Sequence, residues 1–374
     1  MSEYQYVAFR AIDAPLNEEQ LDFMRGQSSR AELTPWSFDN EYHYGSFRGN
    51  RFEMLRRGYD FHLHYANFGI RTLMIRFAAG LPNAGQLKPY LGEALQIIKD
   101  KSGPGVVLCI ESPSGEDYRE GLWDLDELIP RLLPLRDEIA RGDLRPIYLA
   151  RLMALLDEGP EDATEPPVPA GLASLTDAQN AMRALYEIDD SLLGAVAQVS
   201  PPVPKKIDER HAYGDWLDRQ SATKKSQWLV DLMADPASRI RTELLAAFRR
   251  EAPPAKWPTV KSRRTLAEIL ATAKEIKEQA RSKAAADAAR RRTARLKELA
   301  REPQRYLREA AELVTERSVA SYEKAARLLA DLREALAGSN QSALPEQFAR
   351  KLRSKNPKLH HLSAALRRQG FLAK

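Results

Sequence analysis

The segment YDFHLHYANFGIRTLMIRFAA (residues 59–79) decides the fold class, because it predicts two consecutive β-strands. Both halves of the segment are rich in aromatic and β-branched residues, and apolar residues alternate with polar ones along them. An alternation with a period of two is typical of strands that bury one face. YQYVAFRAI (residues 4–12) has the same character and predicts a further strand.

A helix is predicted between these strands, and a hairpin after them. LNEEQLDFMRG (residues 16–26) has apolar residues at helical spacing and ends in Gly26, which is placed to stop a helix. ALQIIKDKSGPGVVLCIES (residues 94–112) has an apolar run on each side of a turn at residues 101–103, which is the pattern of a β-hairpin. Residues 1–122 are therefore expected to form an α+β domain, a mixed sheet with helices on one face.

The middle of the chain, residues 123–250, is predicted to be mostly helical. From Asp124 onward, Leu, Ile and Met recur at intervals of three and four residues. Two proline-rich stretches interrupt this pattern, and their composition favours stiff linkers. We expect these linkers near residues 160–170 and 200–206.

The last region, residues 251–374, is predicted to be helical and to contain one long helix. Thr265 and Glu268 have the spacing of a capping box, and no helix-breaking residue follows before Pro303. About 37 residues at a rise of 1.5 Å each would give a helix roughly 55 Å long. Shorter amphipathic segments follow, so we expect a helical bundle after the long helix. The chain as a whole is assigned to the α+β class.

Charge is distributed unevenly along the chain. From Glu251 to Lys374 there are 28 Lys and Arg residues and 14 Asp and Glu residues, a net charge of +14. The preceding 250 residues have 29 and 38, a net charge of −9. This asymmetry fits either a basic module for an acidic partner or a basic half that docks on its own acidic half.

Positive charge is concentrated in the second half of the predicted long helix. From Arg281 to Arg301, eight Lys and Arg residues stand against Asp287 and Glu298, and they fall on most of the helix circumference. We take these eight as candidate residues for binding nucleic acid or an acidic protein partner: Arg281, Lys283, Arg290, Arg291, Arg292, Arg295, Lys297 and Arg301.

The same stretch argues against recognition of a base sequence. Asn and Gln, whose amides read base edges, are nearly absent from it. Tyr306 is the only aromatic residue between residues 284 and 313, whereas proteins that bind single strands stack bases on several such rings. Any contact with nucleic acid is therefore expected to be made through phosphate.

No complete catalytic or cofactor signature occurs in the sequence. It lacks the common glycine-rich nucleotide-binding motifs, the G-x-S-x-G motif of hydrolases and the H-E-x-x-H motif of zinc proteases. We therefore predict no catalytic residue and no cofactor. His62 and His64 stand two apart in a predicted strand, so both rings project from one sheet face; with His43 they are the candidate metal ligands, and cross-strand packing is the competing interpretation.

The only cysteine, Cys109, lies in an apolar run and is expected to be a buried thiol. A single cysteine allows no intramolecular disulfide, which favours a reducing compartment. The amino terminus lacks the pattern of a signal peptide, and no run of eighteen apolar residues occurs. We expect a cytoplasmic protein that makes no contact with a membrane.

Two stretches resemble known families. MSEYQYVAFRAID (residues 1–13), SSRAELTP (28–35) and the strand segment quoted above look like an uncharacterised family of bacterial proteins, over roughly the first 200 residues. That resemblance implies a bacterial cytoplasmic protein without a known activity. RRTLAEIL (263–270) and LHHLSAALRRQGFL (359–372) are similar to the helical tail of some bacterial SWIM zinc-finger proteins. Their zinc ligands are missing from this chain, so the resemblance implies no zinc.

Taken together, these patterns favour a non-enzymatic bacterial scaffold whose basic C-terminal helices dock on an acidic protein surface. The first alternative is a nucleic-acid-associated protein that uses the same helices to bind phosphate without base specificity. The second is a metal-dependent enzyme that uses the N-terminal histidines.

Overall fold

The computed structural model describes residues 3–373 except 82, 101–102, 104, 113–124, 205–208 and 235–239. The chain divides into two compact units, Met1–Lys277 and Glu278–Lys374, which we call unit 1 and unit 2. Unit 1 contains a large sheet with helices and unit 2 is helical, so the predicted α+β class is confirmed.

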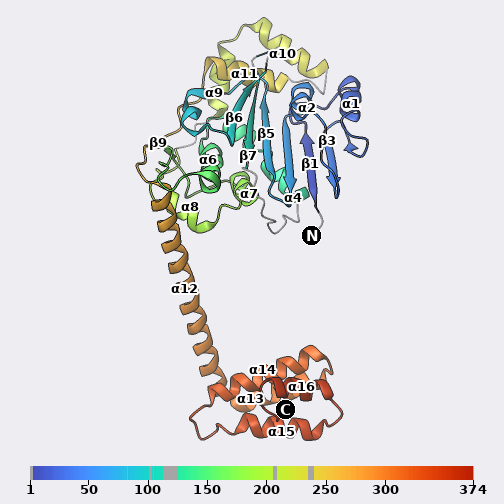
Figure 1. Ribbon diagram of the computed structural model, residues 1–374, viewed down its shortest axis with the longest axis vertical. Helices are drawn as coiled ribbons and strands as arrows, with labels where there is room; N and C mark the ends of the chain where they lie inside the picture. Colours follow the sequence, from blue (N-terminus) through green and yellow to red (C-terminus); the bar gives the residue numbers. More distant parts are fainter. Residues whose placement is uncertain are drawn as a thin grey trace. The chain divides into compact units, whose positions relative to one another are not determined.

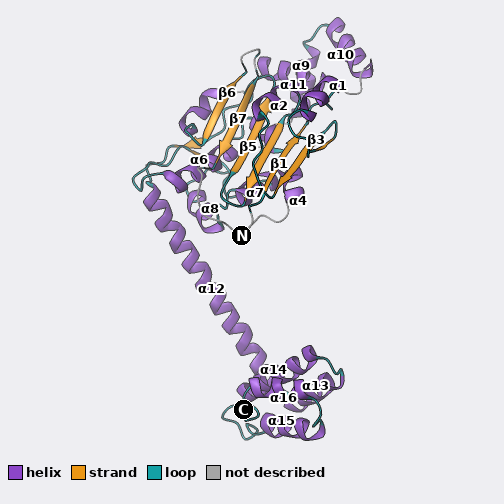
Figure 2. Cartoon of the chain, turned by 45° about the vertical axis from the view of Figure 1, so that its right-hand side comes forward, coloured by secondary structure: helices purple, strands orange, loops and turns teal. Residues whose placement is uncertain are grey.

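Unit 1 is built around a seven-stranded antiparallel sheet (Figures 1 and 2). Its strands are β1 (Gln5–Arg10), β2 (Glu32–Leu33), β3 (Ser37–Tyr42), β4 (Phe61–Ala66), β5 (Arg71–Phe77), β6 (Leu95–Lys99) and β7 (Val106–Glu111). They are arranged in the order β2-β3-β1-β4-β5-β7-β6. The segments quoted above form β1, β4 and β5, and the predicted hairpin is β6 with β7; most of its turn lies outside the described residues.

Both faces of this sheet are covered by helices, whereas we expected helices on one face. Phe61 and Leu63 of β4 point into one core, and Val7 and Phe9 of β1 point into the other. The reason is that the central strands have apolar residues at successive positions and not only at alternate ones. The second core is closed by α1 (Glu18–Arg25) and α2 (Arg51–Arg57).

The first core is closed by helices of the middle region. They are α4 (Leu125–Leu132), α5 (Leu135–Ala140), α6 (Arg145–Glu158), α7 (Asp177–Leu185) and α8 (Asp190–Ala197). Two short helices, α3 (Ala84–Leu87) and the 3₁₀ helix Lys88–Tyr90, add Leu87 and Tyr90 to it. Because sheet and middle helices share this core, the expected boundary after residue 122 marks a change of composition and not the end of a core.

The proline-rich stretch near residues 160–170, expected to be a linker, is packed into unit 1. Glu165 is buried and forms an ion pair with Arg264, at 2.8 Å. The hydroxyl of Tyr90 donates to the carbonyl oxygen of Pro167 at 2.6 Å. The strand β8 (Val168–Pro169) then pairs with β9 (Thr259–Val260). Proline suits this path, because it has no backbone N–H that would need a partner.

The described part of the second expected linker, residues 200–204, also contacts the fold; residues 205–206 lie outside the described residues. The backbone N–H of Gly171 donates to Pro201 at 2.8 Å, and the Ser200 hydroxyl donates to Pro169 at 2.7 Å. Gly171 has φ +91°, and a Cβ there would lie 2.6 Å from Val203. This position therefore requires glycine on two grounds, conformation and space.

Three further helices of unit 1 surround an aromatic cluster. They are α9 (Glu209–Asp218), α10 (Ala222–Ala234) and α11 (Ile240–Glu251). Trp216 of α9 is buried, stacks on Trp228 at 5.5 Å and meets Phe248 edge to face at 5.8 Å.

The long helix α12 (Leu266–Arg301) begins in unit 1 and continues into unit 2. The predicted capping box is confirmed: the backbone N–H of Thr265 donates to the Glu268 carboxylate at 2.8 Å, and that of Glu268 donates to the Thr265 hydroxyl at 3.3 Å. Ile269 and Ala273, in its first turns, belong to the core of unit 1.

Unit 2 has a core of its own, formed by the end of α12 and four helices. These are α13 (Pro303–Thr315), α14 (Val319–Ala335), α15 (Leu344–Lys355) and α16 (His360–Arg368). The apolar face of α14 is buried from Tyr322 to Leu332, as is Leu336 directly after the helix. The expected bundle after the long helix is thus present.

Across the part of the chain that the structure describes, no helix combines the length and the apolar character that crossing a membrane requires.

Two glycine substitutions test the packing of unit 1. We expect Gly171→Ala to lower the free energy of unfolding by about 1 to 3 kcal/mol, because alanine is strained at this φ and meets Val203. Gly214→Ala is the control: it lies inside α9 with nothing within 4 Å of the added Cβ, and should raise stability by up to about 1 kcal/mol. All five tryptophans lie in unit 1, so fluorescence during urea unfolding measures that unit. Equal effects of the two variants would contradict the packed path of residues 165–204.

Candidate functional site

The eight predicted cations all lie on α12 within unit 2. Seven of them are exposed, and Arg295 is half-buried. The helix is continuous through these positions, so its regular geometry spreads the side chains around the axis as predicted.

Three of the eight have acidic partners. Arg292 contacts Asp331 at 2.8 Å and Glu334 at 2.6 Å, both on α14. Arg295 contacts Glu298 at 3.2 Å, and Arg290 lies 3.9 Å from Asp287. Among the described residues, the other five have no acidic partner: Arg281, Lys283, Arg291, Lys297 and Arg301. Most of the positive charge predicted for this helix is therefore not neutralised by its neighbours.

A second group of cations lies on α15, on α16 and in the loop between them. These residues were not among the candidates chosen from the sequence. From residue 347 to the end of the chain there are eight Lys and Arg residues and no Asp or Glu residue. Arg368 pairs with Glu323 at 2.9 Å, and Arg353 donates to the carbonyl oxygen of Pro357 at 2.6 Å. Five others are exposed and have no ion pair among the described residues: Arg350, Lys351, Lys355, Lys358 and Arg367. The signal that could have found them is the absence of acidic residues after Glu346.

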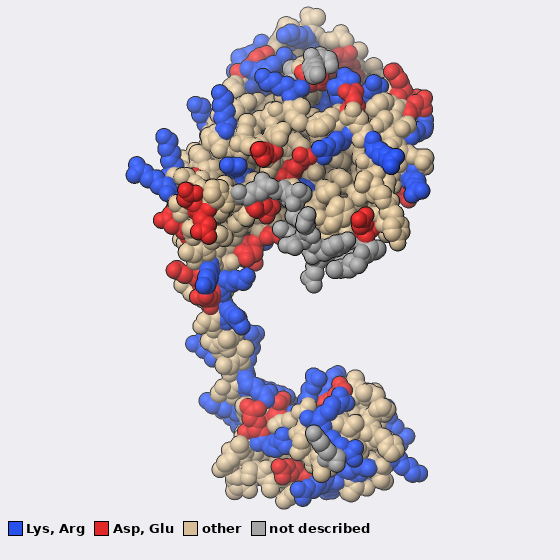
Figure 3. Space-filling model, viewed as in Figure 1, with Lys and Arg blue, Asp and Glu red and all other residues tan. Residues whose placement is uncertain are grey.

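The packing of α15 and α16 explains why these cations are exposed. Ala349 and Leu352 of α15, with Leu362 and Leu366 of α16, fill the core of unit 2. Each helix buries its apolar face in this core, so the cations on its opposite face are exposed to water. Figure 3 shows Lys and Arg side chains over α12 and the C-terminal helices, with Asp and Glu in fewer places on the face in view.

The surface of unit 2 offers little apolar area. Among its described residues, Val319 is the only large hydrophobic side chain that is exposed. Tyr306 is buried, and its hydroxyl donates to Glu298 at 2.6 Å, so it cannot stack on a base. The arrangement can attract anions over a broad area, but its described residues expose no Phe, Tyr or Trp ring on which a base could stack.

The candidate metal ligands His62 and His64 are neighbours on one face of β4, as predicted, but His43 does not join them. The rings of His62 and His64 lie 6.5 Å apart. His43 is exposed and lies 5.6 Å from the ring of Tyr4, which packs against the core on the other face of the sheet. Among the described residues no three potential ligands form a metal-binding group.

Both paired histidines are built into the sheet as packing residues. His62 stacks on Phe9 at 4.1 Å, and its Nδ1 donates to the carbonyl oxygen of Ala8 at 3.0 Å. Burial, with a smaller effect of His64, lowers the pKa of His62 to about 3. Burial, with a smaller effect of Arg51, lowers the pKa of His64 to about 4. Both rings are therefore neutral at pH 7.

Cys109 is buried, as predicted, and burial raises the pKa of its thiol to about 12. A thiol with this pKa is a poor nucleophile at neutral pH.

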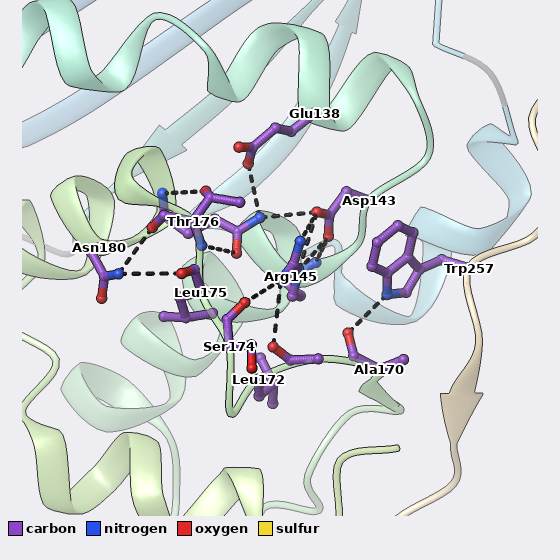
Figure 4. Close-up of polar contacts among 12 residues, drawn as sticks. Glu138, Asp143, Arg145, Ala170, Leu172, Ser174, Leu175, Thr176, Asn180 and Trp257 are labelled. Carbon is purple, nitrogen blue, oxygen red and sulfur yellow. Dashed lines mark hydrogen bonds and ion pairs between the residues drawn. The ribbon is translucent and has the colours of Figure 1, made fainter. Parts of the chain in front are cut away.

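A buried polar network joins α5, α6 and α7 to residues 170–176 (Figure 4). Arg145 forms an ion pair with Asp143 at 2.6 Å, and both side chains are almost fully buried. The same guanidinium donates to the carbonyl oxygen of Ser174 at 2.7 Å, and the Gln179 amide donates to Asp143 at 2.9 Å. Trp257 lies against Arg145, and its Nε1 donates to Ala170 at 3.0 Å. Because these charges are paired and hydrogen-bonded, we interpret the network as structural.

Breaking the network should destabilise unit 1. We expect Arg145→Met to lower the free energy of unfolding by about 3 to 5 kcal/mol, because it leaves the Asp143 carboxylate buried without its partner. Arg131→Gln breaks the exposed pair with Asp177 and should cost no more than about 1 kcal/mol. Urea unfolding followed by tryptophan fluorescence measures both. Similar costs for the two variants would contradict the structural role of the network.

The histidine pair should make stability depend on pH. The unfolded chain takes up protons below about pH 6.5, whereas the folded chain leaves His62 and His64 neutral until the pH falls to about 4 and below. Stability should therefore decrease as the pH falls through this window, by about 1.4 kcal/mol per pH unit for each histidine.

His62→Leu should reduce that dependence by one histidine. Met74→Leu, at the position paired with His62 on β5, alters the same core without removing a titrating group and should keep the wild-type slope. Urea unfolding at pH 6 and pH 5 measures the slopes. A His62→Leu slope equal to that of Met74→Leu would show that His62 does not titrate as its burial requires.

We compared the chain with protein-family models, with curated proteins and with solved structures. None of them matches it.

Proposed function

We propose that unit 2 binds the phosphate backbone of nucleic acid, without base specificity, through the exposed cations of α12, α15 and α16. The observation that carries the proposal is the exposed set of Lys and Arg residues that have no acidic partner among the described residues. Unit 2 has 22 Lys and Arg residues and 11 Asp and Glu residues, a net charge of +11. Such an excess attracts a polyanion mainly by releasing its counterions.

The exposed surface favours phosphate over the acidic protein partner that the sequence favoured. Stable protein interfaces place apolar and aromatic side chains at their centre, and these supply most of the binding energy. In the described part of unit 2, Val319 is the only large apolar side chain that is exposed and could be at the centre of such an interface. Contacts with phosphate need only long cationic side chains, which this surface has in number.

The same surface supports binding that ignores sequence. Base reading requires Asn, Gln or Arg side chains held in a fixed geometry against a groove. The exposed cations of α12 point in many directions around the axis, and no Phe, Tyr or Trp ring is exposed for stacking in the described part of unit 2. We therefore expect duplexes and single strands to bind whatever their base sequence, with an affinity that falls as the salt concentration rises.

Fluorescence anisotropy with labelled duplex and single-stranded oligonucleotides tests the proposal. The logarithm of the affinity should fall linearly with the logarithm of the salt concentration, with a slope of about −0.9 per phosphate neutralised on a duplex. Changing four cations of α15 and the following loop to Gln should weaken binding and make the slope shallower by about one for each phosphate that is no longer neutralised. The four are Arg350, Lys351, Lys355 and Lys358.

The control removes the same charge from unit 1. Four of its exposed cations are also changed to Gln: Arg30, Arg48, Lys88 and Arg219. Equal weakening in the two variants would mean that net charge alone matters and that unit 2 is no site. A polyglutamate peptide that competes at equal affinity would favour an acidic protein as the partner. No binding at low salt would exclude the nucleic-acid function.

A further inference from the structure

A cavity of about 150 Å³ lies in unit 1 between α11 and the C-terminal end of β5. Figure 1 shows these two elements in the ribbon of unit 1. Residues 77–81, which end β5 and follow it, form part of its wall, and α5 adds another part. The α11 wall consists of positions 241, 242, 245, 246, 249 and 250, which share one face of the helix along its whole length. The cavity is large enough for several water molecules.

The wall of this cavity combines apolar side chains with an excess of arginine. Leu245 and Ala246, at the middle of the α11 face, and Ala140 of α5 are apolar. The charged lining residues are four arginines and two aspartates: Arg136, Arg241, Arg249, Arg250, Asp13 and Asp137. A ligand that fits must therefore combine an anionic group with a short hydrocarbon part.

Two of the arginines are paired. Arg136 donates to both carboxylate oxygens of Asp13, at 2.7 and 2.6 Å, and these side chains are buried. Arg241 lies 4.0 Å from Asp137, the only other carboxylate in the lining. Each aspartate of the lining thus already has an arginine beside it, and Arg249 and Arg250 supply the excess positive charge of the lining.

Arg249 is the group that most requires an anion. It is half-buried, and among the described residues it forms no ion pair. Burial lowers the pKa of its guanidinium, and the nearby charge of Asp137 offsets this only in part. A cation taken partly out of water without a partner is costly, and a bound anion would remove that cost.

We propose that this cavity binds a small organic carboxylate, with the carboxylate on the Arg249 guanidinium and the hydrocarbon part against Leu245, Ala246 and Ala140. The planar fork of arginine matches a carboxylate, which can accept two hydrogen bonds from it. The site belongs to unit 1 and is independent of the phosphate-binding surface of unit 2.

Isothermal titration of the full chain with sodium butyrate, at an ionic strength held constant with sodium chloride, tests the site. Wild type should give saturable binding, and butyramide, the uncharged analogue, should give none. Arg249→Gln should weaken butyrate binding by at least about tenfold, the loss expected for a charge-assisted hydrogen bond. Arg249→Lys should weaken it less, because the charge stays and the fork is lost. Arg48→Gln, on an exposed loop of unit 1, should bind as wild type does.

Several outcomes would overturn the proposal. They are equal affinity in Arg249→Gln and wild type, equal binding of butyramide, and the absence of saturable heat in wild type. Inorganic phosphate that binds as tightly as butyrate would also overturn it, because the apolar wall would then contribute nothing. Urea unfolding provides the check on folding: Arg249→Gln, which loses an unpaired half-buried charge, should be at least as stable as wild type.

Discussion

The ion pair between Asp143 and Arg145 is the constraint on which unit 1 depends. Two charges this deeply buried are tolerated only when their hydrogen bonds are completed by other groups. Here those groups come from α7 and from the segment that follows the proline-rich path, and Trp257 closes the network from a third stretch of chain. One pair of residues thereby joins three segments that lie far apart in the sequence, beside the apolar core that packs the helices of the middle region on the sheet.

The elements that the sequence predicted well are those whose pattern is local. The strands β1, β4 and β5 are short segments rich in apolar residues, and that composition can be read within each segment. The helix α12 has a capping box at Thr265 and no helix-breaking residue along its length, so it too can be predicted from its own segment. The proline-rich stretch near residue 165 was misread as a linker because its partner, Arg264, is 99 residues away. Composition describes a segment by itself, and it carries no information about which distant side chain will bury it.

The candidate sites follow the same rule. The cations of α12 were found because they are dense in sequence, whereas those of α15 and α16 are spread out, and what distinguishes them is the absence of acids around them. His62 and His64 could be placed on one face from strand geometry alone. His43 follows β3, which β1 separates from β4, and the cavity at α11 draws its wall from several separate segments. Neither could be predicted from spacing.

The chain's one thiol, on β7, is sealed in the second core and is held in its protonated form. Reagents that react with cysteine thiols should therefore not modify the native cysteine of the folded protein. A cysteine introduced at any exposed position would be the single reactive one, so a dye, spin label or crosslinker could be attached at a chosen residue without first removing the native side chain.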